Sequence, residues 1–195
     1  PTPADLPALA QGLVRLPEHD LAIVPGVSIT AAGRPDVMRG EEVQLLGAVA
    51  AGLAPADSLL VQPGTHCKWV QMEAGKVADF TTAMTGELFA LLRKHGLLAA
   101  QLSGEVSLGD AFLAGVEDGK RQDLAAALFG IRAAKMLGTR DDADAASYAS
   151  GLLIGSDVAA RLAESQHDAV HILADPVLGA LYSAAVAAHG RTAHL

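Results

Sequence analysis

The stretch SLLVQPGTHCKWVQMEAGKVADFTTA, residues 58–83, decides the fold of this chain. Its first part is apolar and ends in a Pro-Gly turn, and its middle part alternates between two faces. An Ala-Gly pair then supplies a hairpin turn, after which the last part returns. The pattern predicts three consecutive antiparallel strands, at 58–64, 66–73 and 76–83.

Beyond residue 84 the hydrophobic period changes from that of strands to that of helices. Apolar residues recur every three or four positions, and Gly96 and Gly138 end two such segments. Three antiparallel strands, several helices and then alternating strand and helix predict an α/β fold with a mixed sheet. The helices are expected at 85–96, 107–119, 122–138, 142–166 and 177–190, and the later strands at 169–175 and from 191.

The residues before this stretch predict less regular structure. Residues 21–29 are expected to form a buried strand broken at a Pro-Gly pair, and 33–42 a charged loop. A helix is expected over 41–52, because two acids stand in its first turn and a glycine ends it. Residues 53–57 are a plausible linker.

Composition excludes several classes of function. A formal charge of −8 argues against a broad electrostatic grip on nucleic acid, although a local loop can still hold a phosphate. Charged residues interrupt every apolar run before the ~20 residues that a membrane helix needs, and the first residues lack a signal-peptide pattern. One cysteine makes neither an internal disulfide nor a Cys-rich zinc site, and a reducing cytoplasm is the simplest location.

The segment PGTHCK, residues 63–68, is the first chemical candidate. A Pro-Gly turn can expose backbone N–H groups, while Thr65 adds a hydroxyl and Lys68 a positive charge, which together suit a phosphate. Most such turns merely join two strands, and neither familiar nucleotide-binding glycine motif is present. A nucleophilic Cys67 with His66 as its base is disfavoured, because neighbours on a strand point to opposite faces.

Two other groups of residues could carry chemistry. His167 and His171 have the spacing of a helical metal pair, but on a strand this spacing separates them by ~13 Å, so we expect no metal site there. Glu41 and Glu42 stand where a loop enters a helix. Acids stabilise helix starts, but a general base is equally compatible with this position, and spacing alone does not decide between these roles.

Four segments together resemble one known family. VMRGEEVQLLGA (37–48), PGTHCKWV (63–70), FTTAMTGELFALL (80–92) and SGLLIGSDV (150–158) occur in the order found in the 2-dehydro-3-deoxygalactonokinases. This family uses ATP to phosphorylate O6 of 2-keto-3-deoxygalactonate, and it belongs to the actin/hexokinase/Hsp70-like ATPases. The resemblance covers nearly the whole chain.

The resemblance implies two RNase H-like domains that close on a nucleotide. Residues 1–57 would be the end of the first domain with a linker, and 58–195 would be the second, nucleotide-binding domain with its C-terminal end missing. The first phosphate motif, a D-x-G-[ST] turn, is not in the sequence. We therefore expect the activity to belong to a longer parent protein. ATP and Mg²⁺ are the implied cofactors, and no residue here is expected to bind the metal.

The resemblance also assigns roles to individual residues. GEEVQLLG (40–47) matches a G-D-Q-Q-A-A-L-V-G-like segment, which makes Glu41 the expected base and Glu42 the second candidate. Arg39 is expected to bind the carboxylate of the sugar acid, either in addition to an acid acting as the base or as the main function of this segment. The second phosphate motif falls on PGTH, and the adenosine motif falls near ILADPVLGALY (172–182), where Asp-Pro replaces small residues. The predicted nucleotide contacts are Gly64, Thr65, His66, Lys68, Ala174 and Gly179.

Two rival interpretations remain. One is a non-catalytic protein of the same fold that binds or senses a sugar acid or nucleotide, and the other is an enzyme that depends on Cys67. The expected partners are a small sugar acid and ATP, with neither nucleic acid nor membrane. A homo-oligomer is compatible with the sequence.

Overall fold

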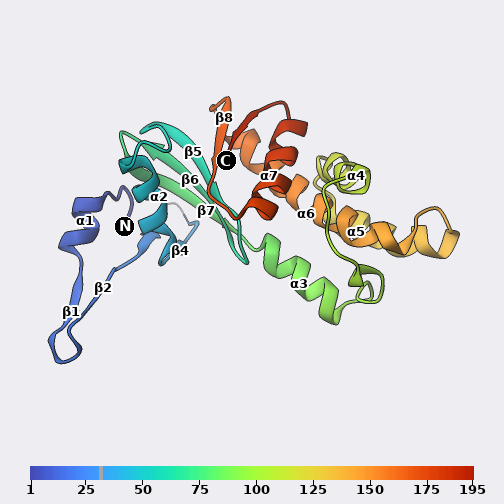
Figure 1. Cartoon of the computed structure of the whole chain (residues 1–195), viewed down its shortest axis with the longest axis horizontal. Coiled ribbons are helices and arrows are strands. Elements are labelled where there is room, and N and C mark those ends of the chain that lie inside the picture. Colours follow the sequence, from blue (N-terminus) through green and yellow to red (C-terminus); the bar gives the residue numbers. More distant parts are fainter. Residues whose placement is uncertain (31–32) are drawn as a thin grey trace. The chain divides into compact units, whose positions relative to one another are not determined.

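The structure is a computed structural model that describes residues 1–30 and 33–195. Five strands form one sheet in the order β7-β6-β5-β8-β9 (Figure 1). Strand β6 runs antiparallel to β5, whereas β9 runs parallel to β8, so the sheet is mixed, as predicted. The strands are β5 (Ser58–Gln62), β6 (Cys67–Glu73), β7 (Lys76–Ala83), β8 (Ala169–Ile172) and β9 (Thr192–His194).

The turn between β6 and β7 follows directly from its sequence. Ala74 and Gly75 have φ angles of 47° and 75°, which is the left-handed pair that a two-residue hairpin requires. Between β5 and β6 the register pairs Val61 with Trp69 and Gln62 with Lys68. Strand β6 is buried from Cys67 to Val70, so both of its faces are covered there. The three predicted strands of residues 58–83 are therefore confirmed.

The chain packs as two compact units. The N-terminal unit comprises Pro1–Gln62 and Lys68–Ala83, and the C-terminal unit comprises Pro63–Cys67 and Met84–Leu195. These two units are not the two RNase H-like domains predicted from the sequence, which would meet after residue 57. That domain boundary stays a prediction.

The N-terminal unit contains the first helices and two small hairpins. Helix α2 buries Leu45 and Leu46, and it packs against β5 and β7. Its sequence prediction is confirmed, since it begins with the two acids and ends before Gly52. The elements are α1 (Leu6–Gln11), β1 (Val14–Leu16), a 3-10 turn (Pro17–His19), β2 (Leu21–Ile23), β3 (Val27–Ile29), β4 (Asp36–Met38) and α2 (Glu41–Ala50).

Two predictions for this unit are wrong in part. The break at the Pro-Gly pair separates β2 from β3, but only β3 is buried, because β2 pairs with β1 in an exposed hairpin. The charged segment 33–42 was expected to be a loop, yet it contains β4, which pairs with β3. Charged flanks concealed a strand of three residues that tertiary pairing stabilises.

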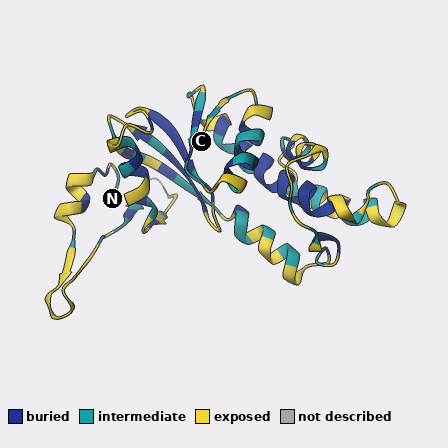
Figure 2. Ribbon diagram, viewed as in Figure 1, coloured by how far each residue is buried: buried dark blue, intermediate teal, exposed yellow. Residues whose placement is uncertain are grey.

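The C-terminal unit is mainly helical (Figures 1 and 2). Helix α6 is its centre, since nearly every residue from Ala145 to Ser156 is buried. The predicted helices are all present, with ends shifted by a few residues. They are α3 (Thr85–His95), a 3-10 turn (Gln101–Ser103), α4 (Asp110–Gly119), α5 (Leu124–Leu137), α6 (Asp142–Glu164) and α7 (Pro176–Ala188).

Helices α4 and α6 cross with their backbones almost in contact. A Cβ atom on Gly115 would lie 2.8 Å from the Leu152 nitrogen, and one on Gly151 would lie 2.9 Å from the Phe112 carbonyl carbon. Real side chains do not reach such distances, so the crossing requires glycine on both helices. Helix α5 is packed more loosely, with Ile131 as its one buried residue and Phe129 and Met136 exposed.

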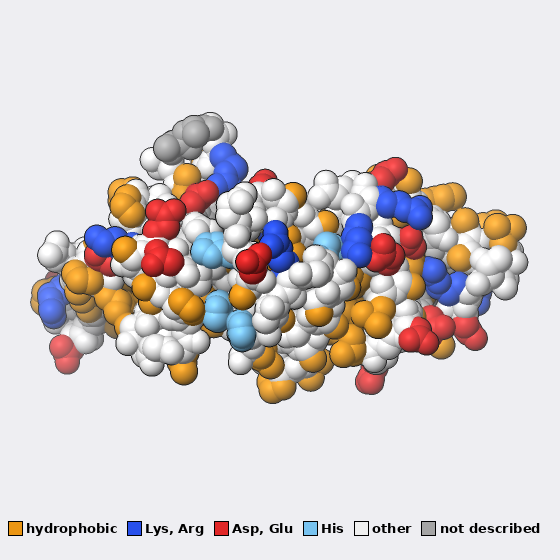
Figure 3. Space-filling model, turned by 90° about the horizontal axis from the view of Figure 1, so that it is seen from above, with side chains coloured by type: hydrophobic (Ala, Val, Ile, Leu, Met, Phe, Trp, Pro, Cys, Tyr) orange, Lys and Arg blue, Asp and Glu red, His pale blue; other side chains and the backbone are white. Residues whose placement is uncertain are grey.

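The surface carries charges of both signs. On the face seen in Figure 3, acidic and basic side chains lie interspersed with apolar ones. Among the described residues, none of the helices has the length and apolar character that crossing a membrane requires.

Candidate active site

The predicted phosphate turn packs against the start of α3 within the C-terminal unit. A Cβ on Gly86 would lie 3.0 Å from Thr65 Cα and still closer to the Gly64 carbonyl oxygen, so only glycine permits this approach. The Glu87 amide donates to the Thr65 carbonyl at 2.9 Å, and His66 Nε2 lies 2.6 Å from Glu87 Oε2. The turn and the first turn of the helix thus form one platform.

The N-terminus of α3 has no side-chain cap. Met84 occupies the N-cap position and makes no side-chain bond there. Thr85 lies inside the first turn, and its hydroxyl donates to Asp157 Oδ2 at 3.0 Å. The Glu87 amide is taken by the Thr65 carbonyl, so the other amides of this first turn and the partial positive charge of the helix start favour an anion such as phosphate.

A small pocket adjoins this platform. Its volume is about 70 Å³, and Gly64, Thr85 and Gly86 form one side of it. The remaining lining is largely apolar, so this side of the platform suits an uncharged group rather than a phosphate. It is supplied by Phe89 of α3, by Ser150, Leu153 and Ile154 of α6, and by Leu178 and Tyr182 of α7.

Tyr182, which lines this pocket, lies beside Cys67. Burial raises the pKa of the Tyr182 hydroxyl well above its usual value, and the nearby Cys67 thiol and Asp157 carboxylate add to this effect. Cys67 is completely buried, whereas the neighbouring His66 is exposed. The two side chains therefore lie in different environments, which does not suit a Cys-His pair.

The predicted adenosine residues have other environments. Asp175 caps α7 by accepting from the Val177 and Leu178 amides at 3.0 and 3.1 Å, so this helix start already holds a carboxylate. Gly179 is buried, and a Cβ there would meet the Leu195 side chain. Ala174 precedes this cap and is half-buried. Neither Ala174 nor Gly179 lines the pocket beside the phosphate turn.

The predicted base and substrate residues lie at the start of α2 in the N-terminal unit. The Arg39 amide donates to Glu41 Oε2 at 3.1 Å, and the Gly40 amide donates to Glu42 Oε2 at 2.6 Å. Gly40 has a φ of 117°, which other residues rarely adopt. Glu42 is 0% exposed, whereas Glu41 is half-buried and Arg39 is exposed.

Lys68 has structural partners in the N-terminal unit. Its side chain is 4% exposed, and its Nζ donates to the Val37 carbonyl and to Thr82 Oγ1, both at 2.8 Å. Thr82 Oγ1 in turn donates to Asp36 Oδ1 at 2.6 Å. These bonds join β6 to β4 and β7. The predicted phosphate contact of Lys68 stays a prediction, and this geometry does not favour it.

The structure therefore divides the predicted site residues into groups. It brings Gly64, Thr65 and His66 together on the platform, and it brings Arg39, Glu41 and Glu42 together at α2. Sequence reasoning missed the contribution of Thr85, Gly86, Phe89, Ser150, Leu178 and Tyr182. A usable signal was the Thr-Gly pair directly after the third strand of residues 58–83, where a glycine opens a helix.

The described part of the chain assembles no group of three or more His, Cys, Asp or Glu side chains that could hold a metal ion. His171 and His194 stack on adjacent strands, with ring centres 4.8 Å apart. Burial lowers the pKa of His171, and the neighbouring histidines add to this effect.

Comparison with known proteins places the chain in a kinase family. The family model for 2-keto-3-deoxy-galactonokinase matches residues 1–195, and the chain belongs to this family. It is 44% identical over 170 residues to the 2-dehydro-3-deoxygalactonokinase of Escherichia coli (strain K12), covering 86% of this chain. A Rhizobium meliloti (strain 1021) protein that is assigned to the same kinase by name is 39% identical over 201 residues and covers 97% of this chain.

A solved structure agrees with this assignment. A crystal structure from Sinorhizobium meliloti, of a protein named for the same kinase, matches 99% of this chain with a TM-score of 0.92 and 36% identity. The chain spans 57% and 64% of the lengths of the two relatives, and 66% of the crystallised chain. The resemblance noted from the sequence motifs is confirmed at the level of the family.

Proposed function

We propose that this chain supplies part of the machinery that transfers the γ-phosphate of ATP to O6 of 2-dehydro-3-deoxy-D-galactonate. The observation that carries the proposal is the platform of Gly64, Thr65 and Gly86, an open helix start packed on a Gly-Thr turn. It occurs in a chain that matches a sugar-acid kinase family along its full length.

In this proposal the platform holds the phosphates of ATP. Gly64, Thr65 and the first turn of α3 supply backbone N–H groups and a hydroxyl, which are donors suited to phosphate oxygens. His66 fixes the turn to the helix through Glu87. The ribose or base then contacts the apolar pocket, and Leu178 and Tyr182 take the place of Ala174 and Gly179 as its wall. Lys68 keeps a structural role.

The start of α2 handles the sugar acid in this proposal. The exposed guanidinium of Arg39 suits the carboxylate of the substrate, because its planar fork pairs with two oxygens. Of the two acids, Glu41 is the base, because solvent and substrate reach it while Glu42 is completely buried. Glu42 holds the Gly40 amide and with it the loop that carries Arg39.

The same proposal includes the RNase H-like, actin-like fold with two closing domains, and a cytoplasmic location. The sheet order with antiparallel β5-β6 and parallel β8-β9 supports the fold assignment. Mg²⁺ is part of the chemistry, since it would neutralise charge on the transferred phosphate. We assign Mg²⁺ no residue of this chain. Such ions are often held by the phosphates of the nucleotide together with one or two carboxylates.

The test is an assay of ADP release. The full-length protein that contains this chain receives ATP, Mg²⁺ and 2-dehydro-3-deoxygalactonate, and we expect ADP release that depends on the sugar acid. The same assay with 2-dehydro-3-deoxygluconate measures how strictly the acceptor is chosen. Binding of sugar acid and ATP without any ADP release would overturn the kinase proposal and favour the binding or sensor function instead.

A further inference from the structure

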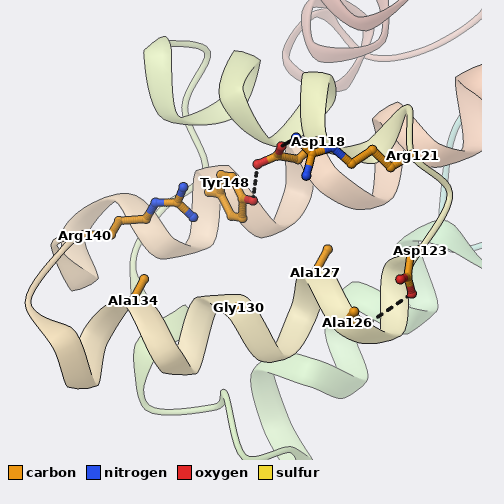
Figure 4. Close-up of a pocket in the computed structure, with 9 residues that line it drawn as sticks. All are labelled: Asp118, Arg121, Asp123, Ala126, Ala127, Gly130, Ala134, Arg140 and Tyr148. Carbon is orange, nitrogen blue, oxygen red and sulfur yellow. Dashed lines mark hydrogen bonds and ion pairs between the residues drawn. The ribbon is translucent and has the colours of Figure 1, made fainter.

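A second hollow in the C-terminal unit has the size of a ligand site. Its volume is about 330 Å³, within the range of ~300–1,000 Å³ that is typical of small-molecule pockets. It lies between α5 on one side and the ends of α4 and α6 on the other (Figure 4). It shares no lining residue with the pocket beside the phosphate turn.

The α5 side of this hollow is made of small residues. Ala126, Ala127, Gly130 and Ala134 recur about once per helical turn, which places them on one face. A Cβ on Gly130 would meet nothing within 4 Å. The hollow therefore exists because this face of α5 has no long side chains, and it offers a surface of methyl groups and backbone (Figure 4).

The opposite wall is a fixed chain of polar groups. The Tyr148 hydroxyl donates to Asp118 Oδ2 at 2.6 Å, and the Arg140 guanidinium lies over the Tyr148 ring, 3.4 Å from its centre. Arg121 forms a long ion pair of 3.7 Å with Asp118 Oδ1. The first two contacts hold Tyr148, Asp118 and Arg140 in place before any ligand arrives, which lowers the entropy cost of binding, whereas Arg121 is 81% exposed.

The charges around the hollow, which include Asp123 at the N-cap of α5, favour a particular chemistry. Arg121 is 81% exposed and Arg140 uses its ring-facing side for Tyr148, so both can pair with a carboxylate. Asp118 and Asp123 each accept one hydrogen bond, from Tyr148 and from the Ala126 amide. A carboxylate has about four acceptor positions, so both acids can also accept from hydroxyl groups of a ligand.

We propose that this hollow binds a small hydroxylated carboxylate of the sugar-acid type. Its carboxylate pairs with Arg140, its hydroxyls donate to Asp118 and Asp123, and its carbon chain lies on the small-residue face of α5. A simple anion lacks donors for the two acids, and a neutral polyol lacks a charge for Arg140. Only a molecule with both groups satisfies the wall.

The experiment is calorimetric titration of the purified protein with D-gluconate as the probe. Sorbitol, which has hydroxyls but no carboxylate, and hexanoate, which has a carboxylate but no hydroxyls, are the matched comparison compounds. We expect gluconate to bind with a Kd in the millimolar range or tighter. Sorbitol and hexanoate are expected to bind at least about tenfold more weakly.

Two variants locate the binding. Gly130→Leu places a side chain in open space and fills the hollow, and Arg140→Gln removes the charge. Because gluconate also resembles the sugar acid proposed to bind at Arg39, both variants are measured in an Arg39→Gln background. There the first should abolish gluconate binding and the second should weaken it by about tenfold or more. Ala125→Leu, exposed on the same helix but outside the lining, is the control and should bind normally. Circular dichroism and thermal melting establish that each variant is folded.

Four outcomes overturn the proposal. They are absence of gluconate binding to the wild type, binding that neither variant changes, equal binding of hexanoate or sorbitol, and loss of gluconate binding when ATP saturates the protein. The last result would make the hollow a part of the nucleotide site. Loss in Gly130→Leu with retention in Ala125→Leu and in the presence of ATP supports the proposal.

Discussion

The helices α2 and α3 begin with different partners for the backbone N–H groups near their first turns. At the start of α2, two carboxylates accept the amides of Arg39 and Gly40. At the start of α3, no side chain caps the first turn, and the hydroxyl of Thr85 donates away from it, to Asp157. Both first turns contain an acid, which is Glu87 in α3, but at α2 the acids accept backbone amides whereas at α3 no side chain caps the helix.

The difference shows how one structural element serves two roles. Acids placed at a helix start keep a carboxylate beside exposed Arg39, which suits proton acceptance from a hydroxyl. A glycine placed at a helix start lets the backbone approach a turn, which suits an anion. Side-chain chemistry determines the first, whereas absence of a side chain determines the second. The following predictions test this contrast, from the largest expected effect to the smallest.

The two acids of α2 should separate activity from stability. Glu41→Gln should lower kcat by roughly 10²–10⁴-fold if Glu41 is the base, and leave the free energy of unfolding within ~0.5 kcal/mol, because its side chain is only half-buried. Glu42→Ala should instead lower the free energy of unfolding by about 2–4 kcal/mol, through a cavity and an unpaired Gly40 amide. Steady-state kinetics and urea unfolding measure both.

Each variant of this pair is the control for the other. If Glu41→Gln kept full kcat while Glu42→Gln, which retains the shape, lost it without unfolding, the roles of the two acids would have to be exchanged.

Substitution of Lys68 tests whether this side chain or the start of α3 attracts the phosphates of ATP. Lys68→Met should lower the free energy of unfolding by about 2–4 kcal/mol, because Val37 and Thr82 lose a buried charged donor. The Kd for ATP should stay unchanged if the start of α3 supplies the field. Denaturant unfolding and equilibrium nucleotide binding are the measurements. A large rise in the ATP Kd with little loss of stability would restore the phosphate contact first predicted for Lys68.

Gly86 tests the close approach of α3 to the phosphate turn. Gly86→Ala should displace the turn, lower the free energy of unfolding by about 1–3 kcal/mol and weaken ATP binding by roughly tenfold. Thermal unfolding and ATP titration measure these effects. Gly47→Ala in the middle of α2 is the matched control, since its added Cβ meets nothing within 4 Å. It should raise stability by up to ~1 kcal/mol. Equal behaviour of the two variants would contradict the platform.

His66 should have the smallest effect. Its ion pair with Glu87 is solvent-exposed, with side-chain exposures of 49% and 37%. His66→Ala should therefore change the free energy of unfolding by no more than ~1 kcal/mol. A modest loss of ATP affinity is expected from looser attachment of the turn. Glu87→Gln, which keeps a hydrogen-bond acceptor, is the control. A loss of stability far above this range would show that the pair is a main support of the turn.

The sequence predicted the regular elements well because local patterns determine them. The hairpin turn at Ala74-Gly75 is predictable because glycine readily adopts the left-handed conformation that Gly75 has there. Helix α2 is predictable because acids favour the first turn of a helix. Short pairings were not predictable in this way. Strand β4 lies in a charged segment, where it pairs with β3 and accepts bonds from Lys68 and Thr82.

The motifs identified the family, because they are contiguous in the chain. They also singled out the turn at residues 63–66 and the acids of α2, and the functional roles of both stay predictions. The pocket beside the turn was missed, because its wall combines α3, α6 and α7, which are far apart in the sequence. The burial of the Lys68 side chain was not predictable, because the alternation of side chains along a strand does not say which face of the sheet is covered.

The sequence by itself determined the class of fold, the family, and the order of the elements that carry the candidate site. Periodicity, turn residues and contiguous motifs are local properties, so they can be recognised in the sequence without knowledge of the packing. Only the tertiary structure decided that Glu42 is buried while Glu41 is accessible, that Gly86 meets Gly64, and that small residues on α5 leave a hollow facing Arg140. Burial and close approach depend on what distant segments place nearby, which no local pattern contains.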